Sequence, residues 1–178
     1  MKLTATSLSG LHRLEPLIHR DERGEFVKTY HRRVFSELGL NFNVAEEFFS
    51  TSGKGVLRGM HLQLPPVAHS KLVFCLHGSV LEVVVDLRCS SPTFGRAHAE
   101  DLNDQNRHAL FIPPGFAHGF LTLSSAAVMY YLTDTEHAPA FDAGIHWNSF
   151  GFPWNVSAPV VSSRDQGLPI LTDFFSPF

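Results

Sequence analysis

The chain has 178 residues, of which 44% are apolar, so we expect one domain over residues 1–178 with a substantial core. The net charge of −3 argues against nucleic-acid binding driven by bulk charge, and no apolar run approaches the ~20 residues that a membrane-spanning helix needs. The first residues lack the long apolar region of a signal peptide, and Cys75 and Cys89 form no metal-spaced pair, so we expect reduced thiols and a cytoplasmic protein.

The first third of the chain predicts strands around one short helix. A polar turn at residues 21–25 leads into a strand at 26–30, whose residues favour extended structure. A short helix is expected over residues 31–39, where Gly39 closes it, and residues 44–52 predict another strand.

From residue 55 onward, short β segments alternate with turns that contain Gly and Pro. The expected strands are 71–76, 80–87, 96–102, 109–112, 116–123 and 127–133. This spacing favours an antiparallel sandwich or barrel, and the chain has neither a βαβ rhythm nor a nucleotide-binding glycine fingerprint. The tail, residues 151–178, should wrap around the barrel and include a short helix near 163–165.

The segment 54–63 carries a cation and an imidazole, Arg58 and His61, on a predicted buried strand. Residues three apart on a regular strand point to opposite faces. Gly59 lies between them and suits a β-bulge, which would turn both side chains toward one cavity. A base beside a phosphate-binding cation is what an enzyme acting on an anionic substrate needs.

Several motifs in register carry a family resemblance. They are residues 58–63, Gly78 with residues 83–88, residues 91–95 and residues 112–120. Together they resemble the nucleotide-sugar 3,5-epimerases, typified by dTDP-4-dehydrorhamnose 3,5-epimerase, from residue 21 to about residue 165. The resemblance implies an all-β, cupin-like double-stranded β-helix jelly roll with short peripheral helices. It also implies a homodimer that binds a nucleotide-diphospho sugar, needs no metal or organic cofactor, and serves deoxysugar and polysaccharide biosynthesis.

The chemistry of such an enzyme sets out which residues to look for. The ketone of a 4-keto sugar acidifies the C–H bonds at C3 and C5. A base removes a proton, an enolate forms, and an acid returns a proton to the opposite face. By resemblance His61 is the base, Asp165 orients it, and Tyr130 is the acid. Alternation places Tyr130 and Tyr131 on opposite faces of their strand, and we expect Tyr130 to line the barrel.

The resemblance assigns the other site residues to substrate binding. Lys71 would stabilise the enolate oxygen, and His118 would hydrogen-bond the sugar or its carbonyl. Phe26 would stack on the nucleobase. The diphosphate would be bound by arginines, whose planar forks each donate two hydrogen bonds: Arg23, Arg58 and Arg164.

The sequence departs from the family pattern in three places. The family often has Glu at the position of Lys28, and Gln-x-Asn where this chain has Glu46 to Phe48. Lys28 and Glu46 would then contact the nucleotide, so a CDP- or GDP-linked sugar is an alternative substrate. The family also often has two tyrosines where this chain has Thr135 and Glu136, which suggests single-site epimerisation or a larger sugar.

Other classes of cupin remain alternatives. Eleven histidines raise the possibility of a metal-dependent cupin, although the residues two positions from His61 are Gly59 and Gln63 rather than further ligands. A non-catalytic sugar-binding cupin would have no use for a base and an acid together. A 3,4-ketoisomerase shares the fold and substrate type but fits the motifs less well.

Overall fold

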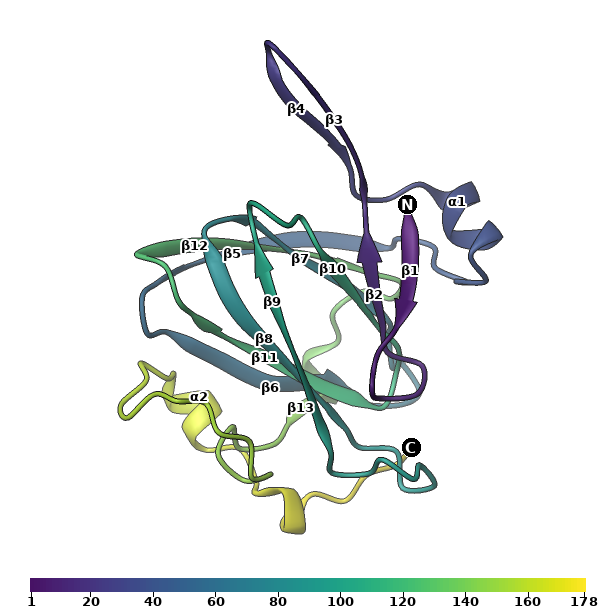
Figure 1. Ribbon diagram of the computed structural model, residues 1–178. Coiled ribbons are helices and arrows are strands. Elements are labelled where there is room, and N and C mark those ends of the chain that lie inside the picture. The colour runs from purple at the N-terminus through teal and green to yellow at the C-terminus, as the bar shows by residue number, and fades with distance from the viewer.

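The computed structural model describes residues 1–178 and contains two antiparallel β-sheets packed face to face (Figure 1). The six-stranded sheet has the order β1-β2-β10-β7-β12-β5, formed by Lys2–Ala5, His12–Glu15, Ala109–Ile112, Lys71–His77, Ala126–Thr133 and Glu46–Gly53. The five-stranded sheet has the order β13-β6-β11-β8-β9, formed by Asp142–Gly144, Leu57–Gln63, Phe116–Thr122, Ser79–Asp86 and Ala97–Asn103. This confirms the all-β prediction and the strands expected after residue 44. Strands β1, β2 and β13 were not predicted, nor was the strand at Leu17–Asp21.

Helices are short and peripheral. They are α1 (Arg32–Glu37), α2 (Ser163–Gln166) and the 3₁₀ turns η1 (Pro139–Phe141) and η2 (Leu171–Asp173). Both predicted helices are confirmed within two residues of their ends. None of the helices has the length and apolar character needed to cross a bilayer.

The main core lies between the two sheets. Inward side chains of β8 and β12, such as Val84 and Met129, pack there with Phe120. A second cluster covers the outer face of the five-stranded sheet, where Val83 and Val85 meet the tail. Because β8 is buried on both faces, it contains three consecutive valines, residues 83–85, rather than alternating apolar and polar residues. The tail runs beneath this sheet in Figure 1, as expected for a wrapping segment.

A third cluster covers part of the outer face of the six-stranded sheet. Phe35 of α1 and the nearby Phe42 pack on Leu72 and Leu132, which point away from the interior between the sheets. The C-terminal end of β12, residues 131–133, is therefore buried on both faces.

Strands β3 (Leu17–Asp21) and β4 (Gly24–Lys28) form a hairpin that pairs only with itself. Figure 1 shows it projecting away from the two sheets. Arg107 forms an ion pair with Glu25, near the turn of the hairpin. The hairpin leaves Phe26 59% exposed. An isolated two-stranded hairpin is only marginally stable in water, so a second surface is expected to cover it.

Candidate active site

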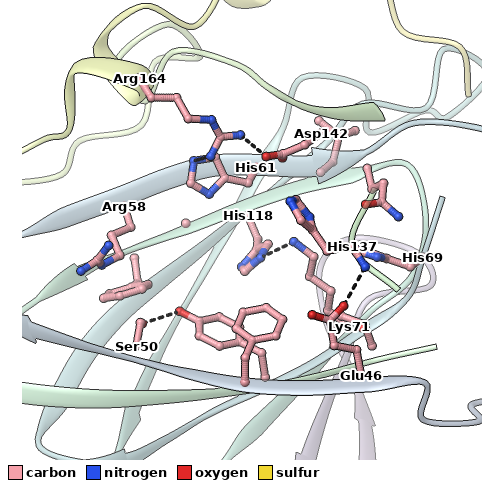
Figure 2. Close-up of a pocket in the computed structure, with 17 residues that line it drawn as sticks. Glu46, Ser50, Arg58, His61, His69, Lys71, His118, His137, Asp142 and Arg164 are labelled. Carbon is pink, nitrogen blue, oxygen red and sulfur yellow. Dashed lines mark hydrogen bonds and ion pairs between the residues drawn. The ribbon is translucent and has the colours of Figure 1, made fainter. Parts of the chain in front are cut away.

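A cavity of about 380 Å³ opens between the two sheets, within the usual size range of small-molecule sites (Figure 2). Polar and titratable side chains from both sheets line it. These are Glu46, Ser50, Arg58, His61, Gln63, His69, Lys71, His118, Tyr131, Thr133, His137, Asp142 and Arg164, with Phe48 and Phe120 among the apolar ones.

The expected bulge at Gly59 is confirmed. His61 pairs with His118 and Arg58 pairs with Phe120, so β6 advances three residues while β11 advances two. Gly59 has φ +131°, and a Cβ there would lie 2.5 Å from the Gly119 Cα. Only glycine suits this close approach, and the bulge turns Arg58 and His61 into the same cavity.

His61 is held by Asp165, as the resemblance implied. Ser162 caps α2 by accepting from the Asp165 backbone N–H, and this fixes Asp165 below β6 with 3% exposure. The His61 Nε2 donates to Asp165 Oδ1 at 2.7 Å, and the Gly59 N–H donates to Oδ2 at 3.0 Å. Burial alone would raise the pKa of Asp165, but these two hydrogen bonds outweigh it and lower the pKa. Asp165 is therefore a carboxylate that leaves Nδ1 of His61 free to accept a proton.

Two guanidinium groups line the cavity with His61, and both are among the predicted diphosphate ligands. Arg164 forms an ion pair with Asp142 at 2.6 Å, and its Nη1 lies 3.5 Å from the His61 Nε2. Arg58 donates to Ser52 Oγ at 3.0 Å and to the Thr51 carbonyl at 3.1 Å. Each Arg keeps further N–H groups for an anion.

Lys71 and His118 lie together in the cavity, where both were expected. Nζ of Lys71 is 3.0 Å from Nε2 of His118 (Figure 2). Burial lowers the pKa of Lys71 to about 8, an effect that the carboxylates of Asp142 and Glu82 partly oppose. Burial and the Lys71 charge lower the pKa of His118 well below its usual value, so the imidazole is neutral. This places an ammonium and a neutral imidazole where a carbonyl oxygen can be bound.

The prediction that Tyr130 lines the barrel is wrong, because the tyrosine in the cavity is Tyr131. Its hydroxyl is 3.3 Å from Ser50 Oγ and its ring stacks on Phe48 at 4.8 Å. Tyr130 points to the opposite face and stacks on Phe74 at 5.3 Å. Burial, with the nearby Glu82, raises the pKa of Tyr131, so it remains a protonated phenol. The resemblance placed the acid one residue too early. The sequence pattern could not correct this, because Leu132 on the outer face is also buried and the strand does not alternate there.

Three predicted substrate-binding residues lie on the hairpin and not at the cavity. Arg23 is bound to Asp21, Phe26 is exposed, and Nζ of Lys28 lies 5.9 Å from the centre of the Phe26 ring. Within one chain they do not line the cavity that holds His61, so their contact with the nucleotide stays a prediction.

The sequence analysis did not identify several residues that line the cavity. Among them are His69, His137 and Asp142. Both ring nitrogens of His69 are buried without a hydrogen-bond partner, and burial together with Lys71 lowers its pKa to about 4. The backbone N–H of His137 donates to Glu46 at 2.6 Å, which brings Glu46 to the cavity as predicted. His69 lies just ahead of β7, so strand alternation offered no signal for it.

No three His, Cys, Asp or Glu side chains are arranged to hold a metal ion. The metal-dependent alternative therefore has no set of ligands.

An imidazole on one sheet and a phenol on the facing sheet suit a reaction that removes a proton from one face of a carbon and returns one to the other. In a cupin-like jelly roll, this arrangement suits a carbohydrate epimerase. The chain belongs to the dTDP-4-dehydrorhamnose 3,5-epimerase family, whose model matches residues 5–173.

Individual relatives agree with this assignment. The chain is 40% identical over 168 residues to a dTDP-4-dehydrorhamnose 3,5-epimerase from Shigella flexneri, covering 93% of each chain. It is 34% identical over 176 residues to a dTDP-4-dehydrorhamnose 3-epimerase from Streptomyces niveus, covering 97% of this chain and 85% of the relative. A crystal structure of an epimerase from Legionella pneumophila in complex with dTDP-4-keto-L-rhamnose superimposes with a TM-score of 0.93 at 34% identity, covering 98% and 94% of the chains.

Proposed function

We propose that this protein inverts C3, C5 or both in a dTDP-linked 4-keto-6-deoxy sugar, as one domain acting in the cytoplasm in deoxysugar biosynthesis. The observation that carries the proposal is the position of His61 and Tyr131. They come from different sheets and line one cavity, and the Tyr131 ring is 6.2 Å from His118, the strand partner of His61. Figure 2 shows His61 on one side of the cavity and Ser50, the neighbour of Tyr131, on the other.

The steps of the reaction follow from these contacts. Nδ1 of His61 takes the proton from the carbon beside the ketone, and Asp165 stabilises the resulting imidazolium. The electron pair moves onto the ketone oxygen, where the Lys71 ammonium, held by its hydrogen bond to His118, stabilises the enolate. Tyr131 returns a proton to the other face of the carbon. Solvent then protonates the phenolate and accepts the proton from His61, which restores the enzyme.

The choice of nucleotide rests on the relatives and on two guanidinium groups. The relatives compared above act on or bind dTDP sugars, and Arg58 and Arg164 in the cavity suit any nucleotide diphosphate. Glu46 and Lys28 support a CDP- or GDP-linked sugar as a second candidate. Glu46 lines the cavity, but one of its oxygens is already used by the His137 N–H.

Assembly as a homodimer would explain the hairpin. Arg23, Phe26 and Lys28 are exposed and do not line the cavity of their own chain, which supports the proposal that they contact the substrate in the cavity of a second copy. The outer face of the six-stranded sheet also carries uncovered apolar side chains, since Phe49 is 64% and Leu76 is 51% exposed. A second copy packed on this face would bury them and cover the hairpin.

Mixing two inactive variants tests the exchange of hairpins between copies. H61N removes the base and leaves the hairpin intact, whereas R23A/F26A removes the hairpin contacts and leaves the cavity intact. When the two variants are unfolded and refolded together, random pairing makes about half of the dimers mixed, and each mixed dimer contains one complete site of two. We therefore expect recovery of about a quarter of the wild-type activity. A mixture of H61N and K71A, both altered in the cavity, should recover nothing. No recovery in the first mixture, with dimers present by light scattering, would show that the hairpin does not act in a partner's site.

Solvent-deuterium labelling tests the activity itself. The protein is incubated in deuterium oxide with the 4-keto-6-deoxyglucose forms of dTDP, CDP and GDP, and proton NMR follows C3 and C5. We expect label with the dTDP sugar. Label at both carbons gives a 3,5-epimerase, label at one gives a single-site enzyme, and label only with CDP or GDP transfers the proposal to that nucleotide. If folded protein labels none of the three, the proposed function is wrong.

A further inference from the structure

Glu82 is a buried acid that the steps above do not use. It lies in the middle of β8 among valines and has 0% exposure. Its Oε1 is 2.6 Å from the His118 Nδ1, while its Oε2 is buried with no hydrogen-bond partner. An isolated charge or an unpaired polar atom in a core is costly. A valine in this place would continue the run of the strand, so packing does not account for the acid.

The contact with His118 extends to Lys71. A lysine ammonium has no acceptor, so Lys71 donates to the His118 Nε2 at 3.0 Å. The single proton of the neutral imidazole is then on Nδ1 and is donated to Glu82. The ring of His118 therefore links an ammonium at the cavity to a carboxylate in the core through two short hydrogen bonds.

This link can carry a proton with all charges balanced. One proton moves from Nζ of Lys71 to Nε2 of His118 while the Nδ1 proton moves to Oε1 of Glu82. The result is a neutral amine and a neutral carboxylic acid, and the imidazole stays neutral with its other tautomer. Burial brings the neutral pair close in free energy to the ion pair, because it raises the pKa of Glu82 well above the ordinary value and lowers the pKa of Lys71 to about 8.

A negative charge at the cavity favours the opposite state. As a negatively charged enolate oxygen forms beside Lys71, protonation of the Lys71 amine becomes more favourable. Glu82 holds the proton that converts this amine back to an ammonium. We propose that Glu82 is a positioning residue that stores the proton of Lys71 and supplies it through His118 when the substrate becomes anionic. This inference rests on the proposed function for its purpose, but the protonation of Lys71 can be measured without substrate.

Other charged or titratable groups also face the hydrogen-bonded link from Lys71 through His118 to Glu82, and the tests leave them unchanged. They are His61, His69, Tyr131, Asp142 and Arg164.

The variant E82Q provides the test, because glutamine keeps an acceptor for His118 but cannot ionise. Removing the carboxylate charge should destabilise the Lys71 ammonium and move its titration midpoint about one pH unit lower. NMR of protein labelled in the lysine side chains measures this directly. The chain has only four lysines, and K71R identifies the Lys71 signal. Lys2, Lys28 and Lys54 serve as internal references that should not respond.

Two further readouts separate the possible outcomes. If the enzyme is active, kcat of E82Q should fall about tenfold at pH 8, with KM changed less than twofold. The alkaline limb of its pH profile of kcat should move to lower pH, whereas E82D should keep the wild-type profile. In the wild type, nitrogen NMR should find His118 neutral with the proton on Nδ1. An unchanged Lys71 titration midpoint in folded E82Q would overturn the inference. If E82Q does not fold, a cationic His118 in the wild-type protein at neutral pH would overturn it. If the wild-type protein is inactive but the Lys71 titration midpoint still moves in E82Q, only the proposed function is contradicted.

Discussion

H61N is expected to slow solvent-deuterium exchange at the carbons beside the ketone by about 10²- to 10⁴-fold, which is the usual contribution of a general base. Asparagine retains a donor for Asp165 but cannot take up a proton. His61 is partly exposed at the cavity and packs little of the core, so the variant should fold and still bind nucleotide diphosphate. Proton NMR in deuterium oxide measures the exchange, and calorimetry measures the binding of dTDP.

A matched histidine provides the control. His77 lies at the end of β7 with a side chain that is 70% exposed, outside the cavity. H77N should keep wild-type exchange. If H61N exchanges deuterium at the wild-type rate, the base lies elsewhere and the assignment of His61 is wrong.

The second large effect concerns the tyrosine pair. Y131F is expected to slow epimerisation at least 10²-fold while deuterium exchange falls much less, because the phenol returns a proton after the carbon acid has been ionised. Its partner variant Y130F should react like wild type, since Tyr130 stacks on Phe74 on the outer face. The two substitutions are chemically identical and lie at adjacent positions of β12, so general damage to the strand would affect both.

The readout for this pair is the ratio of exchange to inversion in one NMR sample. Label in the starting sugar without inverted product would identify Tyr131 as the acid. Loss of activity in Y130F with a normal Y131F would contradict the structure and restore the sequence-based choice.

The sequence predicted most of the β-sheet framework because its strands are bounded by Gly and Pro turns. It also predicted the bulge at Gly59, since a glycine between Arg58 and His61 is the simplest way to place both in one cavity. His61 and Asp165, which are 104 residues apart, could be paired only through the family resemblance. No periodicity connects residues that far apart.

Two features could not be predicted, for physical reasons. The facing of Tyr130 and Tyr131 depends on which side of β12 is covered, and α1 covers the outer side as well. Glu82 lies in a run of valines that predicts a core strand, and its value as a proton site depends on a histidine 36 residues away on β11. Both depend on contacts between strands, which a single sequence does not encode locally.

The most direct test of the central claim is a crystal structure of H61N bound to the dTDP-linked 4-keto-6-deoxy sugar, whose turnover this variant should block. We predict that residue 61 and the hydroxyl of Tyr131 lie on opposite faces of the reacting carbon. The keto oxygen should lie within hydrogen-bond distance of Nζ of Lys71. A sugar ring with both side chains on one face, or with its ketone turned away from Lys71, would contradict the account.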